Sequence, residues 1–276
     1  MKKLFQIEFS KTINYGPVKI LIPLHILFFF LGFFALPKIK IDFPFLSVIP
    51  LYQFPHVWNF ISWVGGYYNL TLVLLVIMLT SLEFGNKTYK HQIIFGLSRK
   101  ELFLQKVMLA AILSLYVIVL IFIAAMISGL VYSYKITPAI IFDRSWILLG
   151  SFLQTFIWLM LGVLFALLFK NMILSVLIFG FYRVFLEPIV RSLMAKEASW
   201  YFPTKFVTKL TPEPDVLNIV KAKLEAAEQA TPVELESMGD KIFPDIPIIQ
   251  NIILSLIFLG LILFFTYFVF QKRRMN

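Results

Sequence analysis

The sequence predicts an all-α polytopic membrane protein with six transmembrane helices. Hydrophobic residues occupy 60% of the 276 positions and charged residues only 14%, and a water-soluble fold cannot bury so much apolar surface. Several uncharged runs also reach the roughly 20 residues that a helix needs to cross a hydrocarbon layer about 30 Å thick. Finally, the excess of basic residues lies in alternate loops, as the positive-inside rule expects.

Six runs have the length and composition of membrane spans. The first is slightly short, follows charged amphipathic sequence and lacks a small-residue cleavage site, so we interpret it as a retained span rather than a signal peptide. The fifth starts near Met172 and meets charged residues before it has finished crossing. The runs are 20–36, 61–82, 107–134, 146–169, the run from 172 onward, and 246–270.

The placement of basic residues predicts the orientation. With the N-terminus inside, the inner segments hold 13 basic and three acidic residues, whereas the outer loops hold 10 basic and 11 acidic ones. We therefore expect both termini to be cytoplasmic. Because the basic residues do not cluster on a soluble face, we expect no nucleic-acid partner.

Residues 195–245 form the one polar region of any size on the predicted outer side. Five prolines divide it, and it contains two helix starts, one at Asp215 and one in a capping box that runs from Thr231 to Glu234. About fifty residues with so few large apolar groups cannot form a core of their own. We expect a small helical extracytoplasmic cap packed on the outer ends of the spans.

Motifs for catalysis or nucleotide binding are missing from the sequence. No Walker A motif is present, and residues 85–88, which superficially resemble its last positions, lack the preceding glycine-rich turn. The chain has no cysteine, and His25, His56 and His91 lie in separate segments without carboxylates at metal-ligand spacing. We expect neither an enzyme nor a bound metal or cofactor.

One cluster of charged residues lies at membrane depth. Arg183, Glu187 and Arg191 follow an i, i+4, i+8 spacing on one helical face, which favours a charge-compensated ladder. Counted at about 1.5 Å per residue from Met172, Arg183 lies about 17 Å into the span. The cluster is either a structural ion-pair network or part of a gate or substrate path. Pro188 predicts a bend there.

The inner loop between the second and third spans, residues 83–106, is basic and amphipathic. It predicts a short helix, a tight turn at Gly96, and a second helix that begins in a capping box from Ser98 to Glu101 and continues into the third span. In the first of these helices, one face can meet the membrane or neighbouring spans through Tyr89, Ile93 and Ile94. The other face meets water through Lys87, Lys90 and His91.

These residues resemble the ABC type-2 export permease family, the membrane subunits of transporters whose ATPases are separate chains. The resemblance rests on Glu83 at the end of the second span, on Lys87 and Thr88, on the run 93–101, and on the following Lys106. The order of elements agrees over essentially the whole chain. The outer segment, residues 195–245, is longer than many family members carry.

The resemblance implies one transmembrane domain over residues 1–276, with an N-terminal interfacial elbow helix at 1–17 and a cytoplasmic coupling helix within 83–106. Two cytoplasmic ATPase subunits, which bind ATP and Mg²⁺, would dock on this loop, and the turn at Lys170 and Asn171 would be a smaller second contact. The implied ATPase-coupling residues are Glu83, Lys87, Thr88, His91, Gly96, Leu97, Ser98, Arg99, Lys100 and Glu101.

The same resemblance implies a second permease chain, identical or different, and a location in the plasma (inner) membrane, in contact with its lipid. Independently, a chain without a nucleotide site or ion-coupling residues needs a partner to drive uphill transport. The Phe-rich, uncharged spans favour a hydrophobic or amphipathic cargo. Two alternatives stay open: a structural or signalling subunit whose outer segment binds another protein, and a channel or ion-coupled carrier.

Overall fold

The computed structural model describes residues 12–35, 49–134, 136–194, 196–212, 214 and 247–272, and all the regular secondary structure in these ranges is helical. Six helical segments are long and apolar enough to cross a membrane, which confirms the predicted spans. They are α2 (Gly16–Ala35), α3 (His56–Gly85), α5 (Arg99–Tyr132), α7 (Ile147–Phe169), the combined α8 (Met172–Phe181), η3 (Tyr182–Leu186) and α9 (Glu187–Ser192), and α14 (Ile248–Lys272).

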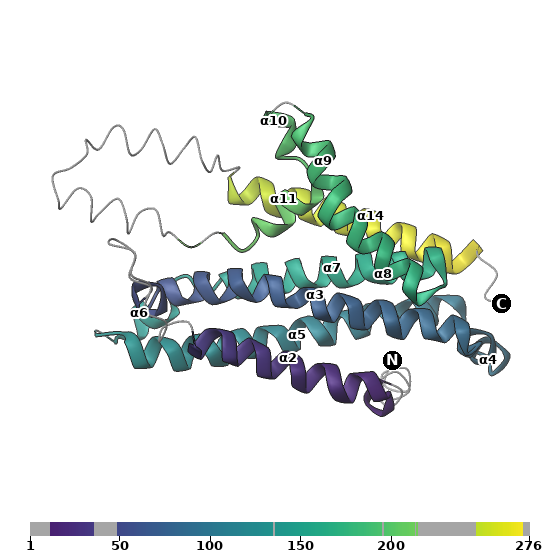
Figure 1. Cartoon of the computed structure of the whole chain (residues 1–276), viewed down its shortest axis with the longest axis horizontal. Helices are drawn as coiled ribbons and strands as arrows, with labels where there is room; N and C mark the ends of the chain where they lie inside the picture. The colour runs from purple at the N-terminus through teal and green to yellow at the C-terminus, as the bar shows by residue number, and fades with distance from the viewer. Residues whose placement is uncertain are drawn as a thin grey trace.

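Short helices connect these segments. They are η2 (Ile49–Tyr52), α4 (Thr88–Ile94), α6 (Pro138–Phe142), α10 (Lys196–Ser199) and α11 (Pro203–Thr208). In Figure 1 the long helices run roughly along one direction, with α4 at one end of the bundle and α6 at the other. We call these the α4 end and the α6 end.

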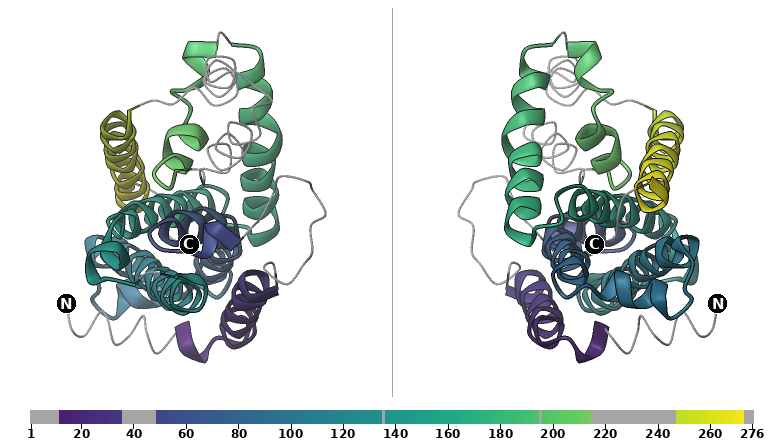
Figure 2. Two further views of the ribbon diagram at one scale, coloured as in Figure 1. Left: turned by 90° about the vertical axis from the view of Figure 1, so that its left-hand side faces the viewer. Right: turned by 90° about the vertical axis from the view of Figure 1, so that its right-hand side faces the viewer.

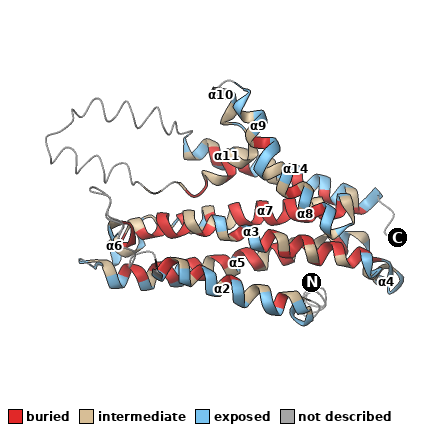
Figure 3. Cartoon of the chain, in the orientation of Figure 1, coloured by how far each residue is buried: buried red, intermediate tan, exposed pale blue. Residues whose placement is uncertain are grey.

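Helices α3, α5 and α7 form the core. They pack closely on one another, and their membrane-crossing stretches are 44–67% buried, whereas those of α2, the fifth span and α14 are 17–22% buried. Figure 3 shows this contrast, and Figure 2 shows α2 and α14 on different sides of the central helices. The outward faces are apolar, as at Leu27, Val119 and Phe264, which suits contact with lipid or another membrane helix.

The fifth span is not a uniform α-helix. Its middle, Tyr182–Leu186, is a π-helical turn in which the Glu187 N–H donates to the carbonyl of Tyr182, five residues back. Pro188 follows at once; it has no N–H, and its ring would clash with the carbonyl four residues earlier in a regular helix. The bend predicted from Pro188 thus takes the form of a widened turn.

Beyond α9 the chain turns back through α10 to α11, which packs against α14 and α7. Figure 1 shows α11 beside α14, while α9 leads away from the central helices. Most of the predicted interfacial elbow helix at 1–17 lies outside the described residues. The helix starts predicted at Asp215 and Thr231 of the outer cap lie wholly outside them.

Candidate functional site

The segment between α3 and α5 forms the helix, turn and helix that the sequence predicts. Lys87 begins α4 in the left-handed conformation, at φ 54°. At the other end of α4, the N–H of Leu97 donates to the carbonyl of Gln92 and the N–H of Gly96 to that of Ile93, both at 3.0 Å. This is a Schellman motif, and it requires the φ of +92° that Gly96 adopts.

A capping box starts α5. The Ser98 hydroxyl accepts a hydrogen bond from the Glu101 N–H at 3.3 Å, and the Glu101 carboxylate accepts one from the Ser98 N–H at 2.7 Å. Two amides that a helix start leaves without partners are thus satisfied. From this point α5 runs for 34 residues without interruption, so the turn after α4 is joined directly to a core span.

Replacing Ser98 with alanine is expected to fray the start of α5 without unfolding the bundle. Loss of an N-cap side chain costs about 1 kcal/mol, and the cap is exposed, so the loss stays local. Hydrogen exchange should accelerate severalfold at the amides of Glu101 and Leu102, which donate to the hydroxyl and the carbonyl of Ser98, while the melting temperature changes little. The matched Ser98→Thr variant keeps the cap and should exchange like the parent chain; equal exchange in the alanine variant would contradict the assignment.

A buried ion pair joins α3 to α5 at the α4 end. The Nζ of Lys106 lies 2.8 Å from Oε1 of Glu83, and the two side chains are 0% and 5% exposed. The same ammonium group lies 5.8 Å from the ring centre of Tyr89 in α4, which is itself buried. Lys106 of α5 therefore contacts both α3 and α4. Because a buried cation that loses its partner is costly, these contacts fix the positions of the three helices relative to one another.

Aromatic packing adds α14 and the α7–α8 turn to this junction. Phe270 of α14 contacts Tyr89 and Phe103, at ring-centre distances of 5.8 and 6.4 Å. Lys170 at the end of α7 lies over the ring of Phe84, 5.4 Å from its centre. Arg99, at the start of α5, donates to the carbonyl of Gln271 in the last turn of α14. Five segments therefore meet at the α4 end.

The tip of the α4 end is exposed and partly apolar. Ile94 is 67% and Phe95 85% exposed, and Lys87, Lys90 and His91 beside them are exposed as predicted. Of the three residues predicted to face the membrane or neighbouring spans, Tyr89 is buried, Ile93 is half-buried and Ile94 is exposed. The predicted ATPase-coupling residues are contiguous here, with Glu83 buried and Lys87, Gly96, Ser98 and Lys100 exposed.

The predicted membrane-depth ladder does not form. Within the described residues neither Arg183 nor Arg191 makes an ion pair with Glu187. Glu187, which is buried, instead accepts hydrogen bonds from the backbone N–H of Thr204, at 2.7 Å, and from its hydroxyl. The guanidinium of Arg183 lies over the ring of Trp158, 4.0 Å from the ring centre. The three residues are therefore divided among α11, α7 and a cavity.

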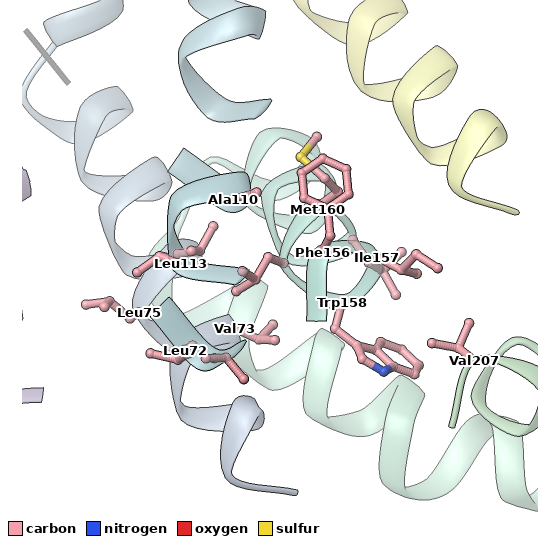
Figure 4. Close-up of a cluster of buried hydrophobic side chains, with 14 of the residues drawn as sticks. Leu72, Val73, Leu75, Ala110, Leu113, Phe156, Ile157, Trp158, Met160 and Val207 are labelled. Carbon is pink, nitrogen blue, oxygen red and sulfur yellow. The ribbon is translucent and has the colours of Figure 1, made fainter. Parts of the chain in front are cut away.

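This cavity has a volume of about 410 Å³ and lies between α3, α7, the fifth span and α11. Its lining includes Trp158, Arg183 and Arg191, together with Lys205 and Lys209 from α11 and the residue after it. Figure 4 shows the indole of Trp158 turned toward Val207 of α11. Packing of α11 on α7 thus closes one side of a space beside the core that basic and apolar side chains line together.

Sequence reasoning missed the uncharged polar residues of this region. The amide of Asn69 in α3 donates to the hydroxyl of Thr155 in α7 at 2.7 Å, and the hydroxyl of Thr211 donates to Oε1 of Gln154 at 2.6 Å. A search for charged residues within the spans overlooks such pairs. The usable signal was an Asn and a Gln inside otherwise apolar runs, because a buried amide needs a partner in a membrane.

Among the described residues, no group of three or more His, Asp or Glu side chains is placed to hold a metal ion. Comparisons with known proteins assign no family: a scan against protein-family models finds no match, and a search of curated proteins finds none.

Proposed function

We propose that this chain is the transmembrane permease subunit of an ATP-driven ABC exporter, that its α4 end faces the cytoplasm, and that separate ATPase subunits dock there. The observation that carries the proposal is the exposed apolar tip, Ile94 and Phe95, on a short helix whose base is fixed by the buried pair of Glu83 and Lys106.

The construction of the α4 end suits the transmission of force. Large exposed apolar side chains surrounded by lysines form a typical docking surface for another protein. The Schellman motif and the capping box fix the chain on both sides of the tip, so a displacement of the tip moves α5 as a whole. The ion pair and the aromatic contacts pass the same displacement to α3 and α14.

ATP hydrolysis by the partner would then change the packing of the core spans. In this proposal the chain forms the translocation path and transmits the movement of the α4 tip to α5, and the partner binds ATP and Mg²⁺. A second permease chain would complete the path on an exposed membrane face of this one. The apolar outward faces and the cavity lined by both basic and apolar side chains together favour a cargo that has both apolar and polar parts.

Substituting Phe95 with aspartate is expected to abolish copurification of an ATPase of the ABC class with the tagged chain in mild detergent. Truncating a central interface residue costs about 2 kcal/mol or more, roughly thirtyfold in affinity, and a carboxylate adds a desolvation penalty. Phe95 is 85% exposed, so helix content and melting temperature should not change. The ratio of ATPase to tagged chain in the eluate is the measurement.

The matched control is Tyr134→Asp, because Tyr134 is 92% exposed just beyond the opposite end of α5. It should leave the ATPase yield at the parent level. Recovery of the parent chain without any ATPase, or an undiminished yield from the Phe95→Asp variant, would refute the proposed docking site.

A further inference from the structure

Four cationic side chains line the cavity between α3, α7, the fifth span and α11: Arg183, Arg191, Lys205 and Lys209. None of its described lining residues is acidic. Glu187, the one carboxylate in this part of the fifth span, is held by Thr204 and does not line the cavity. Two of these cations, Arg183 and Arg191 of the fifth span, therefore border a space that no described carboxylate lines.

The cavity lies away from the ends of the membrane-crossing helices that line it. It is lined by Gly66 to Val73, which begin about 15 Å along the 30-residue helix α3, at 1.5 Å per residue. Arg183 is near the middle of the fifth span. A cation at this depth is costly unless protein groups or a ligand compensate it, and such residues mark ion or substrate paths.

Arg183 is only partly compensated by the protein. Its guanidinium lies over Trp158 and is attracted by the charge of Glu187 one turn further along the helix, but its Nη1 atom is buried and makes no hydrogen bond to any described residue. A guanidinium group presents several N–H donors in one plane, which suits the oxygens of a phosphate. Arg191 borders the same space and is only half-buried.

The other side of the cavity is apolar and borders the outside of the bundle. Leu70 of α3 and Val184 of the fifth span line it and are 43% and 59% exposed, and the aromatic Tyr67 beside them is 61% exposed. These residues lie on membrane-crossing helices, so the space between them faces the lipid. A molecule bound here would have its charged part among the arginines and its apolar part between α3 and the fifth span.

We propose that this cavity binds the phosphate-bearing head of a membrane amphiphile, with Arg183 and Arg191 contacting the phosphate. Arg183 and Arg191 line the cavity and can donate charge-assisted hydrogen bonds, and the guanidinium of Arg183 packs over the Trp158 ring. The apolar border accommodates the start of an acyl chain. Binding follows from the cavity alone; only the amphiphile's status as cargo rests on the proposed function.

The test measures binding to the purified full-length chain in detergent by native mass spectrometry, without any ATPase. Three probes separate the contributions: dioleoyl phosphatidic acid, dioleoylglycerol, which has the same chains without phosphate, and inorganic phosphate. Phosphatidic acid should bind at least about tenfold more tightly than either other probe. Arg191→Gln should weaken its binding about tenfold, and Arg191→Lys should retain most of it.

The matched control is Arg144→Gln, which removes an equally half-buried arginine in the turn between α6 and α7, outside the cavity. It should bind phosphatidic acid like the parent chain. Arg183→Gln should lose binding as Arg191→Gln does. Because it also removes packing on Trp158, Arg191→Gln with unchanged elution and helix content decides the test.

Three results would overturn the proposal. Equal binding of dioleoylglycerol would show that the charge is not used, and phosphate binding as tight as that of phosphatidic acid would show that no amphiphile is needed. Equal losses in the Arg144→Gln and Arg191→Gln variants would indicate non-specific attraction to the basic surface. Since no ATPase is present, each of these results is independent of the copurification experiment.

Discussion

Replacing Glu83 with alanine is expected to lower the free energy of unfolding by about 3–5 kcal/mol, because it leaves the Lys106 ammonium buried without its carboxylate. Lys106 is fully buried, and its Nζ lies 2.8 Å from Glu83. The contact with the Tyr89 ring, at 5.8 Å, is too weak to replace an ion pair. The melting temperature of the purified chain in detergent should fall by several degrees.

The Glu83→Leu, Lys106→Met double variant should be far more stable than the Glu83→Ala chain and close to the parent, because two apolar residues of similar size remove both desolvation costs. The matched surface control is Lys100→Ala, an exposed position on the same helix start, which should change stability by no more than about 0.5 kcal/mol. Additive losses from the Glu83→Leu and Lys106→Met changes in a double-mutant cycle would show that the two side chains do not interact, and would refute the buried ion pair.

The second large effect is expected from Gly150→Ala, which should displace the end of α11 from α7. A Cβ at Gly150 would lie 2.3 Å from the backbone carbonyl oxygen of Leu210. A backbone atom cannot turn away as a flexible side chain can, so α11 must move. The hydrogen bond from Thr211 to Gln154 should be lost with it. Overpacking of this kind costs about 1–3 kcal/mol.

Cysteine labelling measures this displacement directly, since the chain contains no cysteine. Val207 is fully buried in α11, so the introduced thiol of a Val207→Cys variant should react slowly with a maleimide. Adding Gly150→Ala should raise the labelling rate at least about tenfold. Gly260→Ala in α14 is the matched control, because a Cβ there meets nothing within 4 Å; it should leave labelling slow. Slow labelling in the Gly150→Ala background would show that α11 tolerates the methyl group.

The spans and the start of α5 could be predicted because their signals are local. An uncharged run of adequate length specifies a span by itself, and the Ser98 capping box needs only residues three positions apart. The same holds for Gly96, where a single residue carries the left-handed turn. Helix α3 begins five residues before its predicted run and ends three residues after it, whereas α5 begins at the capping box as predicted and ends two residues before the predicted end of its run.

The contacts of the membrane-depth cluster could not be predicted in this way. The spacing of Arg183, Glu187 and Arg191 describes one isolated helix, whereas Glu187 is paired with Thr204 only after the chain has turned back through α10. Trp158, over whose ring the guanidinium of Arg183 lies, belongs to a different span. The pairing of Glu83 with Lys106 likewise depends on how α3 and α5 pack, although both residues stand out in the sequence as charges at the ends of apolar runs.

The length of α5 has a consequence for how far its starting end reaches. A helix of 34 residues measures about 51 Å at 1.5 Å per residue, whereas a bilayer with both polar interfaces is about 40–45 Å thick. A typical tilt of about 20° shortens its projection by only about 3 Å. The remaining projection of about 48 Å exceeds that thickness by about 3–8 Å. We expect this overhang at the end with Arg99, Lys100 and Glu101, where it would hold Phe95 clear of the lipid surface.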